Sequence, residues 1–368
     1  MNFGIPKEVR AHEYRVGLTP ATVDSLVRAG HKVFVETNAG KHAGFKNEDY
    51  QAMGAQVVYT PQEAYGRADV VVKVGRPAEA EYQYFNPQQV IFSFLHLAVA
   101  SPDLLNALQN QKITALGYET IETEDGTLPV MITTSEIAGR LAPAIAGGLL
   151  SSVHGGRGIL VAGVPGTPPA AVVILGAGVL GFHAARAFHN LGAQVIMLDV
   201  DFRALQRIDS MLGGKVTTMF ANPHNIAKTV AFADVLVCTA ATPGGKAPIL
   251  VTREMVKKMQ RRAVILDLAI NSGGNVETSR PTELGDPSYI EEEVIHYCVP
   301  NVPSRVARTG SHSLSNAILP YLLEMGRLGI AEAFKALPDL KRGVNTFEGK
   351  LAHPLIAAAL GKKVEAKI

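Results

Sequence analysis

The sequence predicts an α/β protein of two doubly wound domains, each with a largely parallel sheet between layers of helices. Two observations support this prediction. Short apolar runs alternate with amphipathic helical patterns along nearly the whole chain, which is typical of βαβ units. The 368 residues are enough for about two domains of ordinary size. A hydrophobic content of 47% supplies side chains for two cores, and a charged content of 18% excludes a disordered polar chain.

The N-terminal third contains apolar runs that we expect to form buried strands. They are residues 32–36, 69–74, 90–95 and 113–118. Helices are expected between them, because Thr19-Pro20 and Ser101-Pro102 each place a hydroxyl residue before a proline, a common helix start. Gly30 is expected to end the first of these helices. Strands that alternate with helices in this way predict a parallel sheet.

A second series of apolar runs occupies the middle of the chain. Its expected strands are 171–175, 194–198, 216–219, 234–238, 263–266 and 296–299. Helical patterns lie between them, for example at 203–212 and 253–260. Long helices are expected at 135–152, before a loop rich in glycine and proline at 154–169, and at 311–335. The tail after residue 335 is expected to be helical too.

These elements divide the chain into two expected domains. The first is discontinuous and comprises residues 1–134 plus 305–368, because the C-terminal segment is expected to return to the first sheet. The second comprises residues 135–304. We find no internal repeat of solenoid length.

Charge and cysteine content exclude several classes of protein. With 35 Lys+Arg against 33 Asp+Glu, the net charge of +2 is too small for a protein that binds nucleic acid or an anionic membrane through bulk charge. Cys238 and Cys298 cannot form a disulfide framework or a structural zinc site, and His183 and His189 lack a third ligand, so no metal is expected. We see neither a signal peptide nor an apolar run of about 18 residues, so a cytoplasmic protein without membrane contact is expected.

A glycine-rich segment, Gly-Ala-Gly-Val-Leu-Gly, follows one expected strand and precedes a helix. Gly176 would allow a tight turn, Gly178 would let the backbone approach a pyrophosphate, and Gly181 would let helix and strand pack closely. Val179 would begin the helix, whose N-terminal N–H groups and dipole favour phosphate. Asp199 ends the next strand, where a carboxylate binds a ribose and repels a 2′-phosphate, so NAD is favoured over NADP. The alternative is a glycine turn that only packs.

Considered with this loop, the chain resembles the alanine dehydrogenase family, which also includes the NAD-binding subunit of proton-translocating transhydrogenase. The resemblance covers essentially the whole chain, in segments that occur in the family's order. They are residues 4–8, 15–20, 92–98, 135–140, 155–158, 163–166, 246–248 and 279–282. The segment Phe-Ser-Phe-Leu-His-Leu-Ala favours the dehydrogenase branch. Membership implies oxidative deamination of a small L-amino acid to a 2-oxo acid, ammonia and NADH, by an enzyme that is usually a hexamer.

The resemblance also implies roles for individual residues. Arg15 matches the arginine that holds the substrate carboxylate, a task that suits a guanidinium fork. His96 matches the general acid/base, because an imidazole of near-neutral pKa can take up a proton and return it. The alternatives are a surface charge at Arg15 and a core histidine at His96. Implied cofactor contacts are Ser135, Asp199, Arg280, Asn301 and Val302, the last in place of a methionine common in the family.

The chain departs from the family at two positions that contact the reacting end of the substrate. A lysine that binds and polarises the oxo group is replaced by Gly75. Lys73, on the same face of the strand, and Arg76, on the opposite face, are the available substitutes for substrate binding. A catalytic aspartate is replaced by Asn271, which keeps the size but loses the charge.

Three functions therefore remain open from the sequence. The first is an active alanine dehydrogenase in which other groups replace the two missing ones. The second is a related NAD-dependent oxidoreductase that acts on a different amino or imino acid. The third is an NAD-binding protein that has lost its chemistry. In the first two cases the partners are a small amino acid or 2-oxo acid and further copies of the chain.

Overall fold

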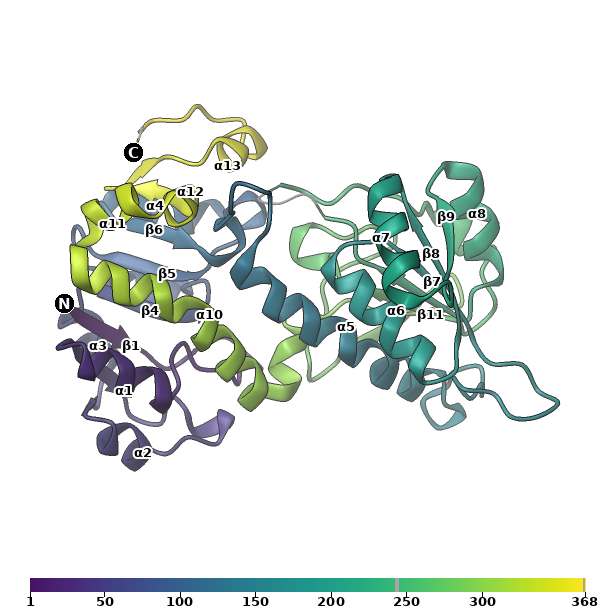
Figure 1. The fold of residues 1–368 in the computed structure, drawn as a ribbon, viewed down its shortest axis with the longest axis horizontal. Helices are drawn as coiled ribbons and strands as arrows, with labels where there is room; N and C mark the ends of the chain where they lie inside the picture. The colour runs from purple at the N-terminus through teal and green to yellow at the C-terminus, as the bar shows by residue number, and fades with distance from the viewer. Residues whose placement is uncertain (242–244, 367) are drawn as a thin grey trace. The chain divides into compact units, whose positions relative to one another are not determined.

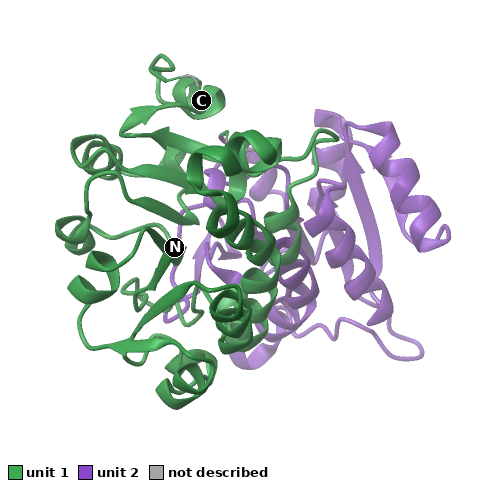
Figure 2. Cartoon of the chain, turned by 60° about the vertical axis from the view of Figure 1, so that its left-hand side comes forward, with its two compact units in different colours: residues 1–134, 243–245, 303–368 green, residues 135–242, 246–302 purple. Residues whose placement is uncertain are grey.

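Each of the two units that Figure 2 distinguishes is built around one sheet (Figure 1). The computed structural model describes residues 1–241, 245–366 and 368. The first unit comprises Met1–Thr134 and Pro303–Ile368, and the second comprises most of residues 135–302. Both sheets are mostly parallel and are packed against helices, so the predicted fold class, with a discontinuous first domain, is confirmed.

The sheet of the first unit has the strand order β15-β14-β6-β5-β4-β1-β2-β3. Its strands are β1 (Asn2–Ile5), β2 (Lys32–Glu36), β3 (Gln56–Val58), β4 (Val70–Gly75), β5 (Val90–Phe94), β6 (Thr114–Gly117), β14 (Val344–Phe347) and β15 (Lys350–Leu351). β1 to β6 run parallel, whereas β14 pairs antiparallel with β6. The strand order reverses between the neighbours β1 and β4, so their carboxyl ends form the topological switch point of this sheet.

Helices cover both faces of this sheet because side chains alternate along each strand. The elements are α1 (Pro20–Arg28), η1 (Lys41–Ala43), α2 (Asn47–Ala52), α3 (Pro61–Gly66), η2 (Glu79–Tyr84), η3 (Leu97–Val99), α4 (Pro102–Asn110), η4 (Tyr118–Thr120), η7 (Val302–Val306), α10 (Ala307–Leu328), α11 (Ile330–Ala336), α12 (Pro338–Arg342) and α13 (Pro354–Ala359). Val72 of β4 lies in one core with Leu314 of α10, which crosses that face in Figure 1. Val71 lies in another core with Leu104 of α4.

The second unit has the strand order β12-β13-β11-β10-β7-β8-β9, with its switch point between β7 and β10. Its strands are β7 (Ala171–Leu175), β8 (Gln194–Asp199), β9 (Thr217–Phe220), β10 (Val235–Cys238), β11 (Val264–Asp267), β12 (Ser288–Glu291) and β13 (Val294–Tyr297). The helices are α5 (Pro129–Leu150), which begins in the first unit, η5 (Ser152–His154), α6 (Val179–Asn190), α7 (Phe202–Leu212), α8 (Pro223–Phe232), α9 (Arg253–Val256) and η6 (Ile270–Ser272). Asp201 and Asn222 cap α7 and α8 by accepting backbone N–H groups.

Several expected elements differ from the structure. The helix expected at 135–152 begins earlier, as α5 at Pro129, and the strand expected at 296–299 is β13 at Val294–Tyr297. The long helix expected at 311–335 is divided into α10 and α11 by Gly329, whose φ of 82° lies outside the helical range. The helix expected at 253–260 ends as α9 at Val256. The tail expected to be helical contains β14 and β15, since Val344 and Thr346 pair with β6, a partner more than two hundred residues earlier in the chain.

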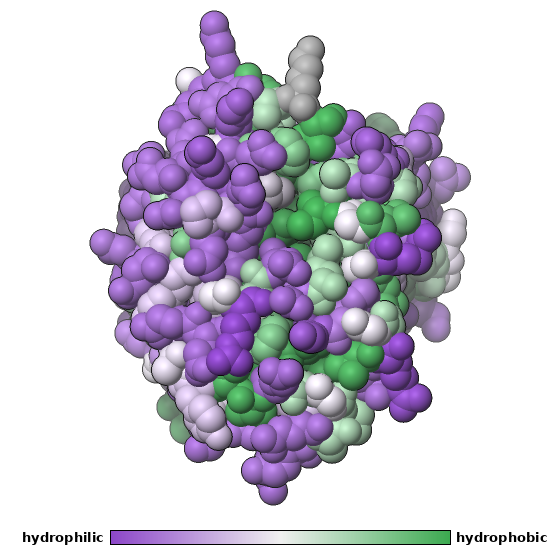
Figure 3. All heavy atoms as spheres, turned by 90° about the vertical axis from the view of Figure 1, so that its left-hand side faces the viewer, coloured by the Kyte–Doolittle hydropathy of each residue, from purple (hydrophilic) through white to green (hydrophobic). Residues whose placement is uncertain are grey.

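Figure 3 shows one face of the molecule, on which hydrophilic side chains predominate and hydrophobic ones gather over part of the surface. Within the described residues, the structure contains no helix with the length and apolar character needed to cross a bilayer.

Candidate active site

Chemistry-bearing side chains of the first unit gather where its parallel strands end. Glu8 and Arg10 follow β1, and Gly75 and Arg76 lie at the end of β4, so both pairs stand at the switch point. His96 follows β5, which is the neighbour of β4. Open α/β sheets bind their ligands at this edge, at the switch point. This edge is therefore the candidate substrate site of the first unit.

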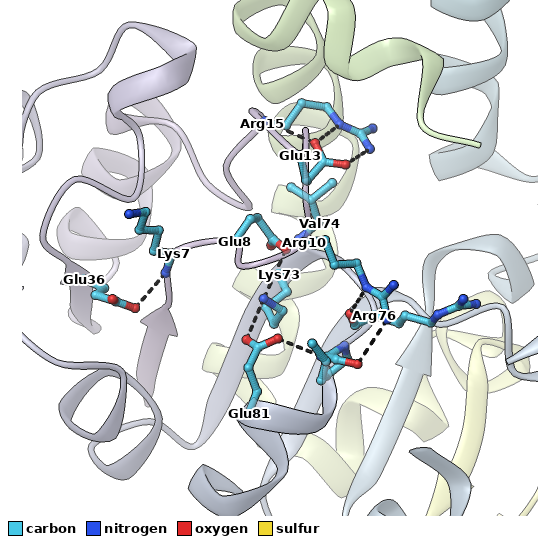
Figure 4. Close-up of polar contacts among 12 residues, drawn as sticks. Lys7, Glu8, Arg10, Glu13, Arg15, Glu36, Lys73, Val74, Arg76 and Glu81 are labelled. Atoms are coloured by element: carbon cyan, nitrogen blue, oxygen red, sulfur yellow. Dashed lines mark hydrogen bonds and ion pairs between the residues drawn. The ribbon is translucent and has the colours of Figure 1, made fainter. Parts of the chain in front are cut away.

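Lys73 lies beneath this edge in a closed ion cluster (Figure 4). Its ammonium is 3.1 Å from a carboxylate oxygen of Glu8 and 2.8 Å from one of Glu81, and the three side chains are at most 3% exposed. Burial lowers the pKa of Lys73, but the two carboxylates outweigh this and the pKa is raised. Tyr65 donates its hydroxyl to Glu81 at 2.9 Å. The geometry does not support the predicted substrate contact for Lys73, because its ammonium is buried and already held by two carboxylates.

Arg15 is also buried rather than a surface charge, with 5% of its side chain exposed. Its Nε and Nη2 atoms each donate to the Glu13 carboxylate at 2.7 Å, a bidentate pair that orients the guanidinium (Figure 4). Gly310 of α10 permits this position, because a Cβ there would lie 2.8 Å from Cδ of Arg15. An arginine has five N–H donors, so the fork keeps donors for a second carboxylate.

His96 is held at the end of β5 by Glu119, which follows β6. The backbone N–H of His96 donates to Glu119 Oε1 at 2.6 Å, and that of Leu95 donates to Oε2 at 3.2 Å. This carboxylate stabilises a left-handed backbone at His96, with φ of 47°, that a non-glycine residue adopts at a cost. The imidazole stacks on the ring of Phe94, with 5.9 Å between the two ring centres. Burial lowers the pKa of His96, Glu119 opposes this and Arg76 adds to it, so the ring is neutral near pH 7.

Gly75 faces the side chain of Arg10. A Cβ at position 75 would lie 3.4 Å from Cδ of Arg10 and 3.6 Å from Oε2 of Glu8. Arg10 Nε donates to the carbonyl oxygen of Arg76 at 2.8 Å (Figure 4), and Nη2 lies 3.5 Å from that of Pro77. Burial, together with the charge of Arg10, lowers the pKa of Arg76. The edge therefore has two neighbouring guanidinium groups beside the position of the missing lysine.

The glycine loop of the second unit follows β7 at that unit's switch point. Gly176 has a φ of 107°, which favours glycine, and a Cβ at Gly181 would collide with the carbonyl oxygen of Gly176. Gly178 caps α6, and a Cβ there would meet nothing within 4 Å, so its backbone is open to a ligand. Val179 begins α6 and is 38% exposed. This arrangement fits a phosphate group at the helix N-terminus.

Asp199 ends β8 and fixes the glycine loop. Its Oδ2 accepts the backbone N–H of Ala177 at 2.6 Å, and its Oδ1 accepts that of Asp201 at 2.8 Å. The carboxylate is partly exposed and keeps lone pairs for a ribose hydroxyl. Ser135 of α5 is half-buried and lies four residues before Gly139, where a Cβ would be 2.5 Å from the carbonyl oxygen of Leu180. Ser135 therefore shares the helix face that packs against the start of α6.

Asn271, predicted as a catalytic residue, and the predicted cofactor residues Asn301 and Val302 follow β11 and β13, which are parallel neighbours. Asn271 in η6 donates its Nδ2 to the carbonyl oxygen of Pro300 at 2.7 Å. Asn301 is half-buried and Val302 is buried. Arg280 is exposed, with its guanidinium 4.0 Å from the ring centre of Tyr289. Among the described residues, no three His, Cys, Asp or Glu side chains are grouped so that they could hold a metal ion.

Sequence reasoning missed Glu119, Glu13 and Arg10. Glu119 had a usable signal, because it is a charged residue directly after a run expected to form a buried strand. Glu13 and Arg10 lie in a segment without periodicity, and their contacts depend on how the loop after β1 folds.

Together, the sheets, the glycine loop and the ionisable edge define a two-domain α/β oxidoreductase of the pyridine-nucleotide class. The chain belongs to the alanine dehydrogenase/PNT family, since residues 4–138 match the family's N-terminal domain and residues 142–354 its C-terminal domain. This confirms the resemblance found in the sequence.

Individual relatives agree with this assignment. The chain is 43% identical over 360 residues to "Alanine dehydrogenase" of Methanococcus maripaludis, which covers 98% of this chain and 96% of that protein. It is 42% identical over 362 residues to "Alanine dehydrogenase" of Bacillus subtilis, at 98% and 95% coverage. A solved structure, "L-alanine dehydrogenase", matches with a TM-score of 0.91 and 41% identity over 98% of this chain and 99% of that one. The transhydrogenase of Sinorhizobium meliloti matches at 0.79 and 26% identity, with 96% and 99% coverage.

Proposed function

We propose that the chain catalyses the reversible oxidative deamination of L-alanine to pyruvate and ammonia, with NAD as the hydride acceptor. The observation that carries this proposal is the position of His96, held by Glu119 at the ligand-binding edge of the sheet, in a chain similar over nearly its whole length to alanine dehydrogenases. The two residues expected to bind substrate and move protons, Arg15 and His96, are both retained and both lie in the first unit.

The two units take different roles in this proposal. Residues 1–134 plus 305–368 bind the substrate, and residues 135–304 bind the cofactor. Gly176, Gly178, Val179 and Gly181 would hold the pyrophosphate of NAD, and the carboxylate of Asp199 would bind its ribose. Ser135, Arg280, Asn301 and Val302 are proposed as its further contacts. A negative charge at Asp199 opposes a 2′-phosphate, which supports NAD over NADP.

The chain's own groups divide the chemistry among them. Bound NAD supplies the acceptor for the hydride that leaves the substrate carbon. Arg15 binds the substrate carboxylate with the donors that Glu13 leaves free. His96 takes a proton from the attacking water and later returns it, because its lowered pKa keeps it a base at neutral pH. Asn271, whose Nδ2 is held by the Pro300 carbonyl, is proposed as the residue that takes the part of the family's carboxylate, with its amide oxygen as the acceptor.

Assembly and location stay predictions. We propose a homo-oligomer, and a hexamer by analogy with the family. The hydrophobic side chains gathered on one face in Figure 3 are of the kind that subunit interfaces cover. The cytoplasmic location inferred from the sequence is a further prediction.

NADH formation by the purified protein with L-alanine and NAD at alkaline pH tests the function, with pyruvate, ammonium and NADH as the reverse assay. NADH binding is followed by its fluorescence, which is easily observed because the chain has no Trp. His96→Gln is expected to abolish turnover and retain NADH binding. His224→Gln is the matched control, because His224 is exposed on α8 and far along the chain from this edge.

The outcomes separate the three functions. Turnover of alanine above that of other amino acids supports the proposal. Faster turnover of a different amino or imino acid than of alanine would show that the substitutions at Gly75 and Asn271 have changed the substrate specificity. NADH binding without turnover of any amino acid would leave a cofactor-binding protein.

A further inference from the structure

The switch point of the first unit has a feature that the proposed function does not use. Arg10 follows β1 and reaches across to the end of β4, the two strands between which the sheet order reverses. Ligands bind at such points in open α/β sheets. Arg10 is exposed, so a ligand can reach the N–H groups that it does not use within the protein.

The absence of a side chain at Gly75 makes room for Arg10. Gly75 does not have the positive φ that favours glycine, so its backbone conformation is open to other residues. Its Cβ position instead points at Cδ of Arg10, only 3.4 Å away. A long side chain at position 75 would compete with Arg10 for the same space.

Arg10 also differs from Arg15 and Lys73 in what it is paired with. Arg15 is paired with Glu13, and the buried Lys73 is paired with two glutamates. Arg10 is anchored by carbonyl oxygens, which orient its guanidinium without cancelling its charge. Among the described residues, neither Arg10 nor Arg76 forms an ion pair with a carboxylate. An anionic or strongly polarised oxygen at this place would have two cationic donors beside it.

The same place adjoins the proton-transfer residue. Gly75 pairs in register with Phe94, whose ring stacks on that of His96. The charge of Arg76 contributes to the lowered pKa of His96, which is a second sign that these groups lie near one another. His96, Arg10 and Arg76 therefore lie at the same edge of the sheet, where a substrate oxygen would bind.

We propose that Arg10, admitted by Gly75, is a catalytic residue that binds the oxygen of the substrate's 2-oxo group and of the carbinolamine formed from it. This inference rests on the proposed function and assigns a residue to its polarising step. A guanidinium stays protonated throughout the accessible pH range, so Arg10 donates hydrogen bonds and no proton. The proton that moves in this step is handled by His96.

Reductive amination of pyruvate by the full chain tests this assignment. Arg10→Ala is expected to lower kcat/KM for pyruvate by about a hundred- to a thousand-fold, as for loss of one oriented donor at a developing charge. NADH binding and Tm are expected to stay close to those of the wild type. Added ethylguanidine should restore part of the activity of Arg10→Ala, which a purely structural role of Arg10 does not predict. Arg305→Ala, an exposed arginine of η7, is the matched control.

An exchange of the two positions makes the test sharper. Gly75→Lys alone is expected to lower kcat/KM, because the new side chain displaces Arg10 and adds a like charge. The double variant Gly75→Lys/Arg10→Ala is expected to exceed Arg10→Ala at least about tenfold, since a cation again occupies the place. Activity of Arg10→Ala within about twofold of wild type, or a double variant no better than Arg10→Ala, would overturn the proposal.

The failure of the proposed function has a different signature. If the wild type does not turn over pyruvate, other 2-oxo acids are screened with the same variants. A 2-oxo acid whose turnover depends on Arg10 in this way supports the assignment and replaces only the substrate. If no 2-oxo acid is turned over by a wild type that binds NADH, both proposals are overturned.

Discussion

The buried cluster of Lys73, Glu8 and Glu81 leads to a quantitative prediction about stability. Replacing Lys73 with Met removes the ammonium that both carboxylates face, and side chains that are 0%, 3% and 3% exposed leave no access for water to take its place. Breaking a buried ion pair typically costs about 3–5 kcal/mol of unfolding free energy. Each kcal/mol lowers Tm by about 2–4 °C in a domain of 150–250 residues. We therefore expect Lys73→Met to lower Tm by about 6–20 °C.

Differential scanning calorimetry at pH 7 measures this change. Arg327→Met is the control, because its partner Glu324 lies at 2.6 Å but the two side chains are 66% and 35% exposed. An exposed pair contributes about 0–1 kcal/mol, so the control is expected to lose at most about 4 °C. A loss in Lys73→Met no larger than that of the control would refute the closed, buried cluster.

The pH dependence of the same variant has a defined sign. In the wild type, burial already raises the pKa of Glu8 against the opposing charge of Lys73. Without Lys73 the folded-state pKa rises further above that of the unfolded chain, so the folded state binds more protons. Stability of Lys73→Met is then expected to rise as the pH falls from 7 towards 5, relative to wild type. Lys73→Met/Glu8→Gln/Glu81→Gln is expected to recover part of the loss and to lack this pH dependence.

Three further predictions concern activity and cofactor binding. The pKa of His96 is lowered, so the acid limb of kcat/KM against pH is expected below pH 6.5, and Arg76→Gln is expected to move that limb upward because it removes a cation. Asp199→Ala is expected to weaken NADH binding, measured by fluorescence titration. The same substitution is expected to reduce the ratio of the protein's affinity for NADH to its affinity for NADPH. Asn271→Asp is expected to lower Tm, measured by calorimetry, by about 2–4 °C, because a carboxylate cannot donate to the Pro300 carbonyl that Nδ2 now contacts at 2.7 Å.

The parts of the fold that the sequence predicted are those with local signals. The glycine loop and the strands before and after it could be predicted because glycine spacing and apolar runs act within about 30 residues. The strand β14 could not, because it pairs with β6 across more than two hundred residues. Helical periodicity in the preceding segment gave no sign that Gly329 would end α10.

The candidate site shows the same division between local and long-range information. Alternation along β4 placed Lys73 and position 75 on one face, and both face Glu8 in the structure. The same alternation suggested Lys73 as a group that contacts the substrate. The sequence around Lys73 gives no sign that Glu8 and Glu81 surround its ammonium. Their meeting depends on segments brought together by the sheet, which a single sequence does not reveal.

The surroundings of the two departures from the family bear on whether other groups replace the missing lysine and aspartate. If the glycine at position 75 reflected a loss of activity, we would not expect an oriented cation in the space where the lysine side chain would lie. Instead Arg10 lies against that space, and two carbonyl oxygens orient it at the sheet's switch point. Asn271 is likewise held by the Pro300 carbonyl rather than left loose. A positive group is thus available where the lysine is missing. This favours an active enzyme in which other groups replace the missing ones over an NAD-binding protein that has lost its chemistry.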